Sequence, residues 1–544
     1  MIATPPVPTL HDRYRGQRVL VTGASGLLGQ AVLEKLLRAM PEIGEVVLLL
    51  RPRGRATVDD RLVEIFRSPL FERLRAERAD FDAWWPTKVS VVAGQLGRPY
   101  LGLETDAWKA LAQRLTAILH MGALASFDEP LDRVLEVNTS GSLDILELAR
   151  EAGDVPLVHV STCYVCGNTA GTHREEALPW GHTPRSMSEG TGPALDPESE
   201  LSTLLQQSRQ LRNEIEAGVH DDFVVRALSK SHVSTERLEA LRRQHADERL
   251  SRMGVRQAGI HGWPDPYPMS KAWAEQLLAR RRGGVPISIV RPAILASTYT
   301  EPEPGWLTGL RMADPLIVAM GRASLDVFPG DRTAAIDLVP CDLAVNAILA
   351  ALPDPAQRGT PRVFQVAGSA RNTLTLGAFH DLCYAALESQ PFLDLRGAPV
   401  HPSRLHFMPA TRFQRSVWRE RRGLQLKIAV LERLGMSERA RRMRASMRFL
   451  GYANRLGRTY APYIIRQFRF TTDNLQQLES ALGPEDRAAF PMDVGAVDWR
   501  RYVTEVHVPA VRREGGGSGN GNGNGNGHRN GNRALAPRRE PPHG

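Results

Sequence analysis

Short apolar runs recur through the first two thirds of the chain, and most lack regular polar alternation. They lie at residues 18–22, 45–50, 88–93, 116–120, 157–162, 287–291 and 362–367. Several of the segments between them, such as 27–40 and 138–150, carry apolar residues at helical spacing. Strands of this kind, separated by helices, are buried on both faces of a parallel sheet. The pattern therefore predicts an α/β fold with a doubly wound parallel sheet covered by helices.

The alternation stops between Gly171 and His261, where no convincing strand occurs. This interval opens rich in proline and glycine and then shows leucines at helical spacing over 201–215. A second helix is predicted over 235–250, with a stop at Gly254. Long ordered insertions between strands are usually lids or binding elements. We predict a helical insertion over 171–261, which is either a lid or a surface decoration.

The pattern changes again after the last apolar run. The sheet is predicted to end near Ala367, and residues 374 to about 509 are mostly helical in spacing. The final segment repeats Gly-Asn and offers no apolar face to bury. The predicted division is therefore an α/β domain over 1–373, a mainly helical C-terminal domain over 374–511 and a disordered tail over 512–544.

Composition narrows the class of protein. The 544 residues are 42% hydrophobic and 24% charged, which is ordinary for a globular chain and excludes disorder over its whole length. Four cysteines are too few for disulfide bonds to stabilise a chain of this size, which favours a reducing compartment. No apolar run approaches the roughly 18 residues of a membrane-spanning helix, and the N-terminal residues lack a secretory signal. We therefore expect a soluble, cytoplasmic protein.

The net charge of +9 is concentrated in one segment. Between Arg412 and Phe470, 16 basic residues accompany 3 acidic ones, so the rest of the chain is slightly acidic. Three interpretations are open: the segment binds ligand phosphates, makes peripheral contact with an anionic membrane, or is a solvated arginine-rich face. Nucleic acid is not predicted as a partner, because aromatic residues are not interleaved as a stacking platform.

The first predicted strand leads into a glycine-rich turn, TGASGLLG at 22–29, and then into a helix. The first glycine permits the tight turn, the second lets the backbone approach a pyrophosphate, and the third allows close packing of helix on strand. Phosphates then meet free N–H groups at the positive end of the helix. This predicts a Rossmann-type dinucleotide site. Its expected binding residues are Thr22, Gly23, Ser25, Gly26, Leu27 and Gly29.

The loop after the second strand selects the cofactor. A carboxylate there would bind the ribose hydroxyls of NAD. This chain instead has Arg51, Arg53 and Arg55, and no carboxylate before Asp59. Arginine pairs well with a 2′-phosphate. The sequence therefore favours NADPH, with Arg51 as a predicted cofactor contact.

A catalytic pair is predicted where the helix beginning YPMSK starts. Tyr267 and Lys271 stand at i and i+4 and therefore share one helix face. The ammonium is expected to lower the pKa of the phenol and to hold the nicotinamide ribose, so that Tyr267 donates a proton to a carbonyl that receives hydride. The strand 157–162 ends in Ser161 and Thr162, and a hydroxyl there is expected to bind the same carbonyl oxygen.

In combination, TGxxGxxG, the strand-end Ser-Thr and YxxxK resemble the extended short-chain dehydrogenase/reductase superfamily. Longer strings, including STCYVCG, HGWPDPYPMSKAWAEQLL and RTYAPYIIRQFRFTTDN, resemble the alcohol-forming fatty acyl-CoA reductases over about residues 15–510. This resemblance implies that NADPH reduces a long-chain acyl-CoA thioester to an aldehyde, with release of CoA. A second NADPH would then reduce the aldehyde to a primary alcohol.

The resemblance also implies residue roles. Thr162, Tyr267 and Lys271 match the catalytic triad, and Thr162 is chosen over its neighbour because it lies five residues before Gly167. Asn138 matches the asparagine that helps to order the lysine in relatives.

Two positions depart from the pattern of the family. After the third strand, Gln95 stands where relatives carry an acidic residue after the glycine, and Leu96 follows it. We expect the Gln95 amide still to bind the edge of adenine, and we predict Gln95 and Leu96 as cofactor contacts. Cys166 replaces a common asparagine and creates Cys163-x-x-Cys166. A zinc site would need two further ligands, and the other cysteines are isolated. We predict small buried side chains and no metal site.

Several alternatives stay open from the sequence. The apolar stretch 305–320 either lines an acyl tunnel or is ordinary core. The reaction either proceeds to the alcohol or stops at the aldehyde, and the thioester is carried either by CoA or by an acyl carrier protein. A sugar-nucleotide or sterol oxidoreductase is disfavoured by the helical C-terminal domain. A non-catalytic NADP- or lipid-binding module is disfavoured by Tyr267 and Lys271. Chain-length preference and oligomeric state are not predicted.

Overall fold

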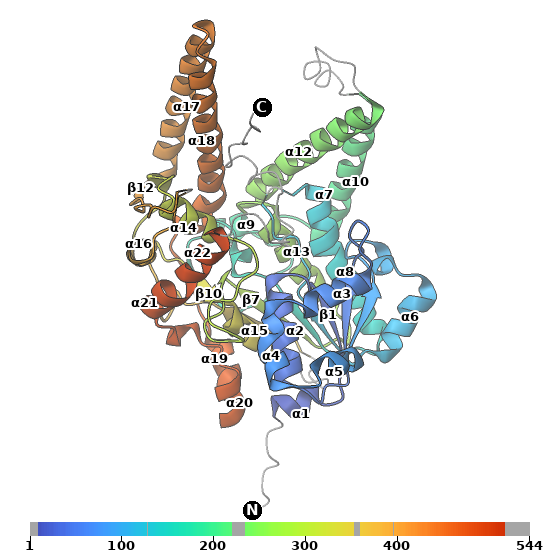
Figure 1. The fold of residues 1–544 in the computed structure, drawn as a ribbon. Helices are drawn as coiled ribbons and strands as arrows, with labels where there is room; N and C mark the ends of the chain where they lie inside the picture. The colour runs from blue at the N-terminus through green and yellow to red at the C-terminus, as the bar shows by residue number, and fades with distance from the viewer. Residues whose placement is uncertain (1–8, 128, 220–233, 353–358, 395, 517–544) are drawn as a thin grey trace, which may run out of the picture.

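The structure, a computed structural model, describes residues 9–127, 129–219, 234–352, 359–394 and 396–516 (Figure 1). At its centre lies a seven-stranded parallel sheet in the order β11-β7-β5-β4-β1-β2-β3. The strands are β1 (Arg18–Thr22), β2 (Glu45–Leu50), β3 (Val89–Ala93), β4 (Ala117–His120), β5 (Leu157–Val160), β7 (Ile287–Pro292) and β11 (Arg362–Val366). The chain winds outward from β1 to β3 and then returns to place β4 on the other side of β1. This arrangement confirms the predicted doubly wound, Rossmann-type α/β class.

Helices cover both faces of the sheet. On one face, α2 (Leu27–Ala39) and α15 (Cys341–Ala350) pack against each other and belong to the main apolar core. On the other, α6 (Thr105–Arg114) and α8 (Gly141–Glu151) bury their apolar residues in a second core, beside α13 (Pro266–Arg281). The strands between the two layers are therefore apolar without alternation.

The insertion forms an arm that projects beyond the sheet (Figure 1). It contains α9 (Pro184–Glu189), α10 (Pro197–Glu216) and α12 (Thr235–His261). The predicted stop at Gly254 is wrong, because α12 continues to His261. Gly254 is buried inside the helix, where an added Cβ would lie 3.0 Å from Cγ of Pro266. The glycine therefore serves close packing against the start of α13 and does not end the helix.

The insertion also contains a strand that the sequence did not predict. Residues Gly171–His173 form β6, which pairs in parallel with β13 (Phe468–Phe470) from the C-terminal region. Three residues carry too little local pattern to be recognised as a strand. Glu175, just beyond β6, accepts hydrogen bonds from the backbone N–H groups of Gln365 (2.7 Å), Asn474 and Leu475 (3.3 Å). The C-terminal region is thus joined to both the insertion and the edge of the sheet.

The C-terminal region is mainly helical, as predicted. Its longer helices are α16 (Leu376–Ser389), α17 (Ala410–Arg433), α18 (Ser437–Ile464), α19 (Asp473–Ser480) and α22 (Val508–Gly516). The last of these runs into the predicted tail, and residues 517–544 lie outside the described part of the chain. Helices α17 and α18 form a hairpin that projects from the same end of the molecule as the arm of α10 and α12, with the hairpin at the upper left and the arm at the upper right of Figure 1.

The stretch 305–320, for which two interpretations were open, ends in α14 (Asp314–Gly321). This helix packs against α16 and α22. Leu316, Ile317 and Met320 are buried in the main core. These three residues are therefore core residues.

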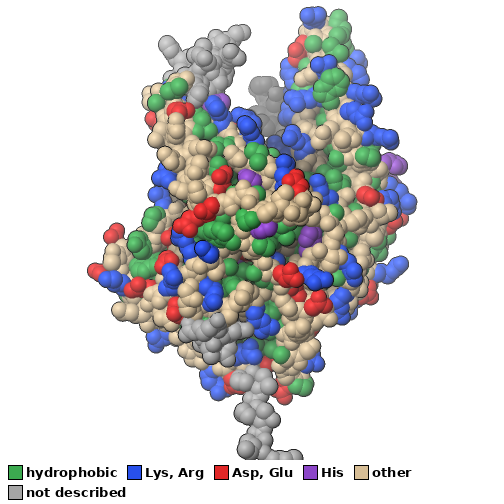
Figure 2. All heavy atoms as spheres, turned by 180° about the vertical axis from the view of Figure 1, so that it is seen from behind, with side chains coloured by type: hydrophobic (Ala, Val, Ile, Leu, Met, Phe, Trp, Pro, Cys, Tyr) green, Lys and Arg blue, Asp and Glu red, His purple; other side chains and the backbone are tan. Residues whose placement is uncertain are grey.

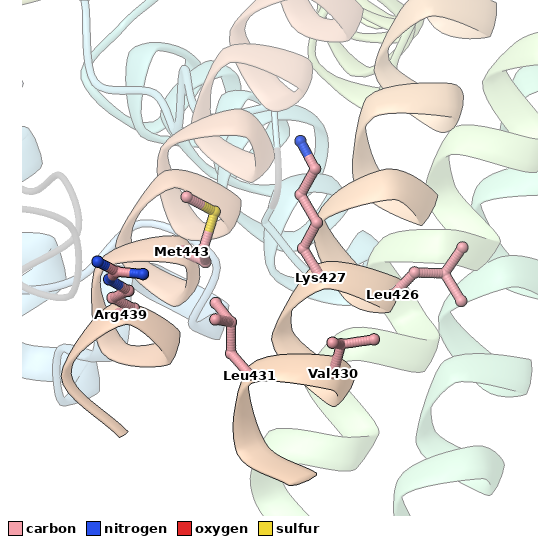
Figure 3. Close-up of a pocket in the computed structure, with 6 residues that line it drawn as sticks. All are labelled: Leu426, Lys427, Val430, Leu431, Arg439 and Met443. Carbon is pink, nitrogen blue, oxygen red and sulfur yellow. The ribbon is translucent and has the colours of Figure 1, made fainter. Parts of the chain in front are cut away.

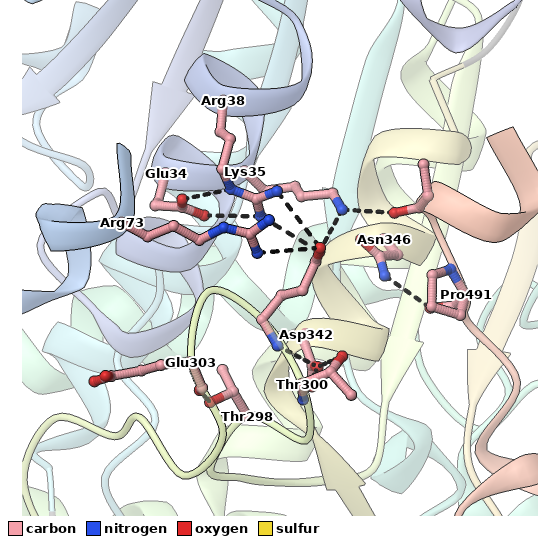
Figure 4. A network of polar contacts seen from close by, with 12 residues as sticks. Glu34, Lys35, Arg38, Arg73, Thr298, Thr300, Glu303, Asp342, Asn346 and Pro491 are labelled. Atoms are coloured by element: carbon pink, nitrogen blue, oxygen red, sulfur yellow. Dashed lines mark hydrogen bonds and ion pairs between the residues drawn. The ribbon is translucent and has the colours of Figure 1, made fainter. Parts of the chain in front are cut away.

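A buried polar network fastens α2 to the C-terminal half (Figure 4). Lys35 of α2 is buried, forms an ion pair with Glu301 and donates a hydrogen bond to the carbonyl oxygen of Ala489 (2.6 Å). The Asp342 carboxylate of α15 accepts hydrogen bonds from the N–H groups of residues 299–301, at 2.7–3.1 Å. Asp342 therefore fixes the backbone of the turn that carries Glu301, while the Glu301 side chain pairs with Lys35.

Candidate active site

The predicted site residues meet at one edge of the sheet. The glycine turn follows β1, Gln95 follows β3, Gly122 follows β4 and Thr162 follows β5. All of these strands are parallel, so their carboxyl ends lie at the same edge. The strand order reverses between β1 and β4, which is the position where doubly wound sheets bind nucleotides.

The glycine turn has the geometry of a phosphate cradle. Gly23 adopts a φ of 77°, and a Cβ there would lie 2.8 Å from the backbone nitrogen of Gly122. A Cβ on Gly29 would overlap the carbonyl oxygen of Gly23, so only glycine allows α2 to approach the turn this closely. Gly26 is the N-cap of α2 and provides no side-chain cap. The first N–H groups of α2 therefore remain available to an anion, and this part of the site fits a dinucleotide pyrophosphate.

The other residues of the turn act through their backbone or hold the turn in place. Thr22 Oγ1 accepts a hydrogen bond from the N–H of Gly122 (3.0 Å) and lies 2.7 Å from Nδ1 of His120. The Ser25 carbonyl oxygen accepts a hydrogen bond from Gln30 (3.2 Å). The side chain of Leu27 is buried in the core. Thr22 thus ties β1 to β4 beneath the cradle, and Leu27 can meet a ligand only through its N–H group.

The loop after β2 carries a group of cations. Arg51 is exposed, and its carbonyl oxygen accepts a hydrogen bond from Arg61 of α3 (Val58–Phe66) at 2.6 Å. Arg61 is 8% exposed, and its Nε has no hydrogen-bond partner among the described residues. Burial, and then the charges of Arg51 and Arg53, lower the pKa of Arg61. A buried guanidinium with an open donor beside other arginines fits an anion such as a 2′-phosphate. Sequence reasoning missed Arg61, because the helix pattern alone does not reveal its burial.

Gln95 and Leu96 lie beside the glycine turn. Gln95 is exposed, and its backbone N–H donates to the carbonyl oxygen of Leu101 (2.8 Å). Leu96 is half-buried, and its side chain packs closely against Gly122 and Gly141. The exposed amide is therefore free to face a ligand at this end of the cradle, while Leu96 fills the space behind it.

Lys271 and Thr162 meet at the carboxyl end of β5. Lys271 is only 2% exposed, and its Nζ donates a hydrogen bond to the carbonyl oxygen of Val160 (2.7 Å). Burial lowers the pKa of Lys271 to about 8. Thr162 is buried, and its Oγ1 accepts a hydrogen bond from the N–H of Tyr164 (3.3 Å). The structure thus brings the predicted lysine and threonine to one strand end from positions more than a hundred residues apart.

Tyr267 occupies the first turn of α13, where it is half-buried. Burial, and then the nearby carboxylate of Asp265, raise the pKa of its phenol. The expected lowering of this pKa by Lys271 is therefore not what the structure shows. A phenol with a raised pKa stays protonated at neutral pH, so Tyr267 remains suited to donate a proton.

Asp265 anchors α13, the helix of the predicted Tyr267 and Lys271 pair, through both of its carboxylate oxygens. Its Oδ1 accepts a hydrogen bond from the N–H of Tyr267 (2.9 Å), which makes it the N-cap of α13. Its Oδ2 accepts a hydrogen bond from the hydroxyl of Tyr463 in α18 (2.5 Å). The ring of Tyr463 also meets that of Tyr164 edge-on, with 4.8 Å between centroids. The C-terminal region therefore contacts the segments of both Thr162 and Tyr267. The position of Asp265 just before α13 could have identified it from the sequence as a helix N-cap, but no local sequence pattern points to Tyr463.

Asn138 supports the turn of α13 that carries the lysine. Its Nδ2 donates to Ser270 Oγ (2.9 Å), and its Oδ1 accepts from the N–H of Leu124 (2.7 Å). Ser270 directly precedes Lys271. Two histidines that sequence reasoning missed, His120 and His159, lie buried nearby, and burial and the charge of Lys271 both lower their pKa. The ammonium of Lys271 therefore faces neutral rings.

The Cys163-x-x-Cys166 segment does not have the properties of a reactive dithiol. Both thiols are free, and Cys163 donates a hydrogen bond to the carbonyl oxygen of Arg291 (2.9 Å). Burial raises the pKa of both, that of Cys166 to about 12, whereas a reactive cysteine has a lowered pKa. Within the described ranges no three His, Cys, Asp or Glu side chains gather to hold a metal ion. The same part of the chain contains no helix long and apolar enough to cross a membrane.

The lowered pKa of Lys271 predicts a pH dependence. Its ammonium is present below about pH 8 and is lost as the pH rises through that value. Because the ammonium is predicted to hold the cofactor ribose, kcat/KM for the reduced cofactor should fall by about tenfold per pH unit above this point. Lys271→Arg stays charged over the whole range, so its residual activity should show no decline near pH 8. A decline of equal position in both proteins would assign the titration to another group.

Comparison with known proteins extends over both regions of the chain. An NAD-binding family model described as male sterility protein matches residues 21–348, and a second model of the same description matches 429–514. The chain is 29% identical to "Fatty acyl-CoA reductase 2, chloroplastic" of Arabidopsis thaliana, over 92% of this chain and 78% of that protein. It is 28% identical to the "Alcohol-forming fatty acyl-CoA reductase" of Simmondsia chinensis, over 91% and 96%.

A solved structure supports the fold. The reductase domain of a non-ribosomal peptide synthetase from Mycobacterium tuberculosis aligns with a TM-score of 0.52 and 17% identity, over 94% of this chain and 92% of that one. The glycine cradle lies where the strand order of the sheet reverses, and this position is consistent with the NAD-binding family model that matches this part of the chain. The chain therefore belongs to the male sterility protein family, in the fatty acyl-CoA reductase group of the extended short-chain dehydrogenases/reductases, and is an oxidoreductase with a nicotinamide cofactor.

Proposed function

We propose that this chain reduces a long-chain fatty acyl-CoA thioester, through the aldehyde, to a primary fatty alcohol, with two NADPH consumed and CoA released. The observation that carries the proposal is the similarity to the alcohol-forming reductase of Simmondsia chinensis, which spans 91% of this chain and 96% of that protein. It therefore includes the C-terminal region as well as the nucleotide-binding part.

Contacts within the described residues support a division of the chain into two domains and a lid. We infer a reductase domain over 1–373, with the insertion 171–261 as an acyl-chain lid, and a helical C-terminal domain over 374–511. In support of the lid, α12 ends at His261, and Trp263 Nε1 then donates a hydrogen bond to the carbonyl oxygen of Val165 (2.9 Å). The insertion thus ends directly at the segment of Thr162 and at the start of the catalytic helix. A cover at this point would keep water from the acyl carbon.

The residues of the site would act on the substrate carbonyl. NADPH, when bound along the glycine cradle with its 2′-phosphate near Arg51 and Arg61, supplies hydride. The Thr162 hydroxyl would bind the carbonyl oxygen, and Tyr267 would give that oxygen its phenolic proton as the carbonyl carbon is reduced. As the carbon–sulfur bond of the resulting hemithioacetal breaks, its hydroxyl would return its proton to the Tyr267 phenolate and leave the aldehyde, and the departing CoA thiolate would take up a proton from solvent. In the second round, Tyr267 would protonate the aldehyde oxygen and leave the alcohol.

The first test is the stoichiometry of the reaction. Purified protein is incubated with palmitoyl-CoA and NADPH, and the extracted products are separated by gas chromatography. The proposal expects two NADPH consumed per CoA released, with hexadecanol as the product. One NADPH with hexadecanal would place the end of the reaction at the aldehyde. No turnover of any acyl-CoA, together with turnover of an acyl-carrier-protein thioester, would contradict CoA as the carrier.

Preference for NADPH over NADH should depend on Arg61. The buried guanidinium and the loop arginines leave an anion site that NADH cannot fill. Arg61→Met is expected to raise KM for NADPH by about 10- to 100-fold and to change KM for NADH little, because one charge-assisted contact contributes about 1.5–3 kcal/mol. Arg67→Ser, an exposed arginine at the end of the same helix, is the matched control. Equal effects on both cofactors would place the 2′-phosphate elsewhere.

A further inference from the structure

The hairpin of α17 and α18 carries an apolar groove near its tip. The groove has a volume of about 590 Å³ and is open to solvent. Figure 3 shows the six residues that line it. Leu426, Val430 and Leu431 line it from α17, and Met443 from α18, with cationic side chains at its rim. Those rim residues are Lys427 and Arg439. We call these six residues the tip groove.

The apolar side chains of this region form a continuous stripe. Leu426 and Val430 of α17 and Leu434, the C-cap of that helix, follow one another at intervals of four and therefore share one face. They are 70%, 54% and 67% exposed, respectively. Single exposed apolar residues are ordinary on protein surfaces. Three that share one face, two of which also line an apolar groove, indicate a binding surface. No described residue outside the hairpin covers this stripe.

Charge indicates what the surface binds. From Ala410 to Ile464 the hairpin carries 14 basic and 3 acidic residues, and Figure 2 shows cationic and apolar side chains interspersed along it. A partner should therefore be negatively charged and also offer an apolar interior. An anionic phospholipid surface has both properties, and cationic helices with exposed leucines are typical of elements that lie in such an interface.

The placement of the hairpin suits this partner. Its tip points away from the sheet, and its base reaches the active site, where Tyr463 of α18 bonds to Asp265 (Figure 1). With 28 residues, α18 is about 42 Å long, so the tip can meet a surface without blocking the site. We propose that the tip groove, the Leu426–Leu434 stripe and the arginines around them dock this protein on anionic phospholipid membranes.

The test is flotation of the full chain with vesicles of phosphatidylcholine containing about one third phosphatidylglycerol. Binding is measured without acyl-CoA or NADPH, so its result is independent of the proposed reaction. The intact chain should float with these vesicles at low salt, should not float with pure phosphatidylcholine, and should be released at high salt, because the screening length falls from about 10 Å at 0.1 M to about 3 Å at 1 M.

Two variants locate the surface. The stripe variant Leu426→Ser/Val430→Ser/Leu434→Ser should bind at least tenfold more weakly, because each buried methylene contributes about fourfold. The charge variant Arg433→Ser/Arg439→Ser/Arg441→Ser should bind about 100-fold more weakly, since one cation near an anionic surface contributes about fivefold. The matched control Arg243→Ser/Arg252→Ser/Arg256→Ser removes equal charge from exposed positions on α12 and should leave binding unchanged.

Each other outcome would overturn the proposal. Absence of flotation by the intact chain at low salt would exclude membrane docking. Equal loss in the α12 control would show that net charge, not the hairpin, drives binding. Sedimentation showing a dimer that the stripe variant disrupts, without any change in flotation, would make the stripe an interface between two copies. Thermal midpoints within about 2 °C of the parent show that the variants remain folded.

Discussion

Replacing Tyr267 with phenylalanine is expected to lower kcat by about 100- to 10,000-fold, because the variant keeps the ring but loses the hydroxyl that we propose as the proton donor. The raised pKa of this phenol keeps its proton in place at neutral pH, and no other acidic hydroxyl lies on the same turn of α13. NADPH binding, followed by fluorescence, should change little, since the lysine and the glycine cradle are untouched. The loss should therefore appear in kcat and hardly in KM for NADPH.

The control for this substitution is Tyr384→Phe. Tyr384 is a half-buried tyrosine on α16, and its hydroxyl bonds to Glu388 (3.3 Å), away from the predicted site. Its activity should equal that of the parent. If Tyr267→Phe keeps more than about a tenth of the parent kcat, the proton must come from another group, and the assignment of Tyr267 as the acid is wrong.

Breaking the buried ion pair between α13 and β7 is expected to cost about 3–5 kcal/mol of stability. Glu275, one turn after Lys271, is 1% exposed and receives two hydrogen bonds from Arg291 of β7, one of them 2.9 Å from Nε. Glu275→Leu leaves the Arg291 guanidinium buried without its partner. The thermal midpoint should fall by several degrees, and activity should fall with it because Lys271 loses its alignment.

Two further variants separate this pair from general effects on α13. Glu275→Leu/Arg291→Met replaces both charges with apolar groups and should recover most of the lost stability, because removing a whole buried pair is often neutral. Glu198→Gln breaks an exposed pair with Arg281 of the same helix and should cost under about 1 kcal/mol. If the double variant is as unstable as Glu275→Leu alone, the side chains contribute through shape and not through paired charge.

The parts of the site that the sequence predicted are those built from short, continuous segments. The turn at 22–29 lies between a strand and a helix, and the pair Tyr267 and Lys271 lies on one helical turn, so spacing alone places them. Strand positions were also predictable, because strands buried on both faces are apolar throughout. The lengths of the elements were less predictable. The sequence predicts a helix stop at Gly254, but this glycine is a packing position inside α12.

Other features arise only when distant segments meet. The strand β6 exists because β13 pairs with it, and Asp265 holds Tyr463 across nearly two hundred residues of chain. The burial of Arg61, and with it the open donor near the proposed 2′-phosphate position, depends on how α3 packs beside the loop after β2. Burial also reversed the expected direction of the Tyr267 pKa, since desolvation depends on all surrounding atoms.

By itself, the sequence of this protein determined the doubly wound class, the phosphate cradle and the tyrosine–lysine pair, because local periodicity and fixed spacing control each of these. The tertiary structure alone decided which charges are buried, how α18 contacts the start of α13, and that the basic segment projects as a hairpin with its apolar stripe exposed. Burial and long-range contact are properties of the packed chain, so no pattern within one segment can specify them.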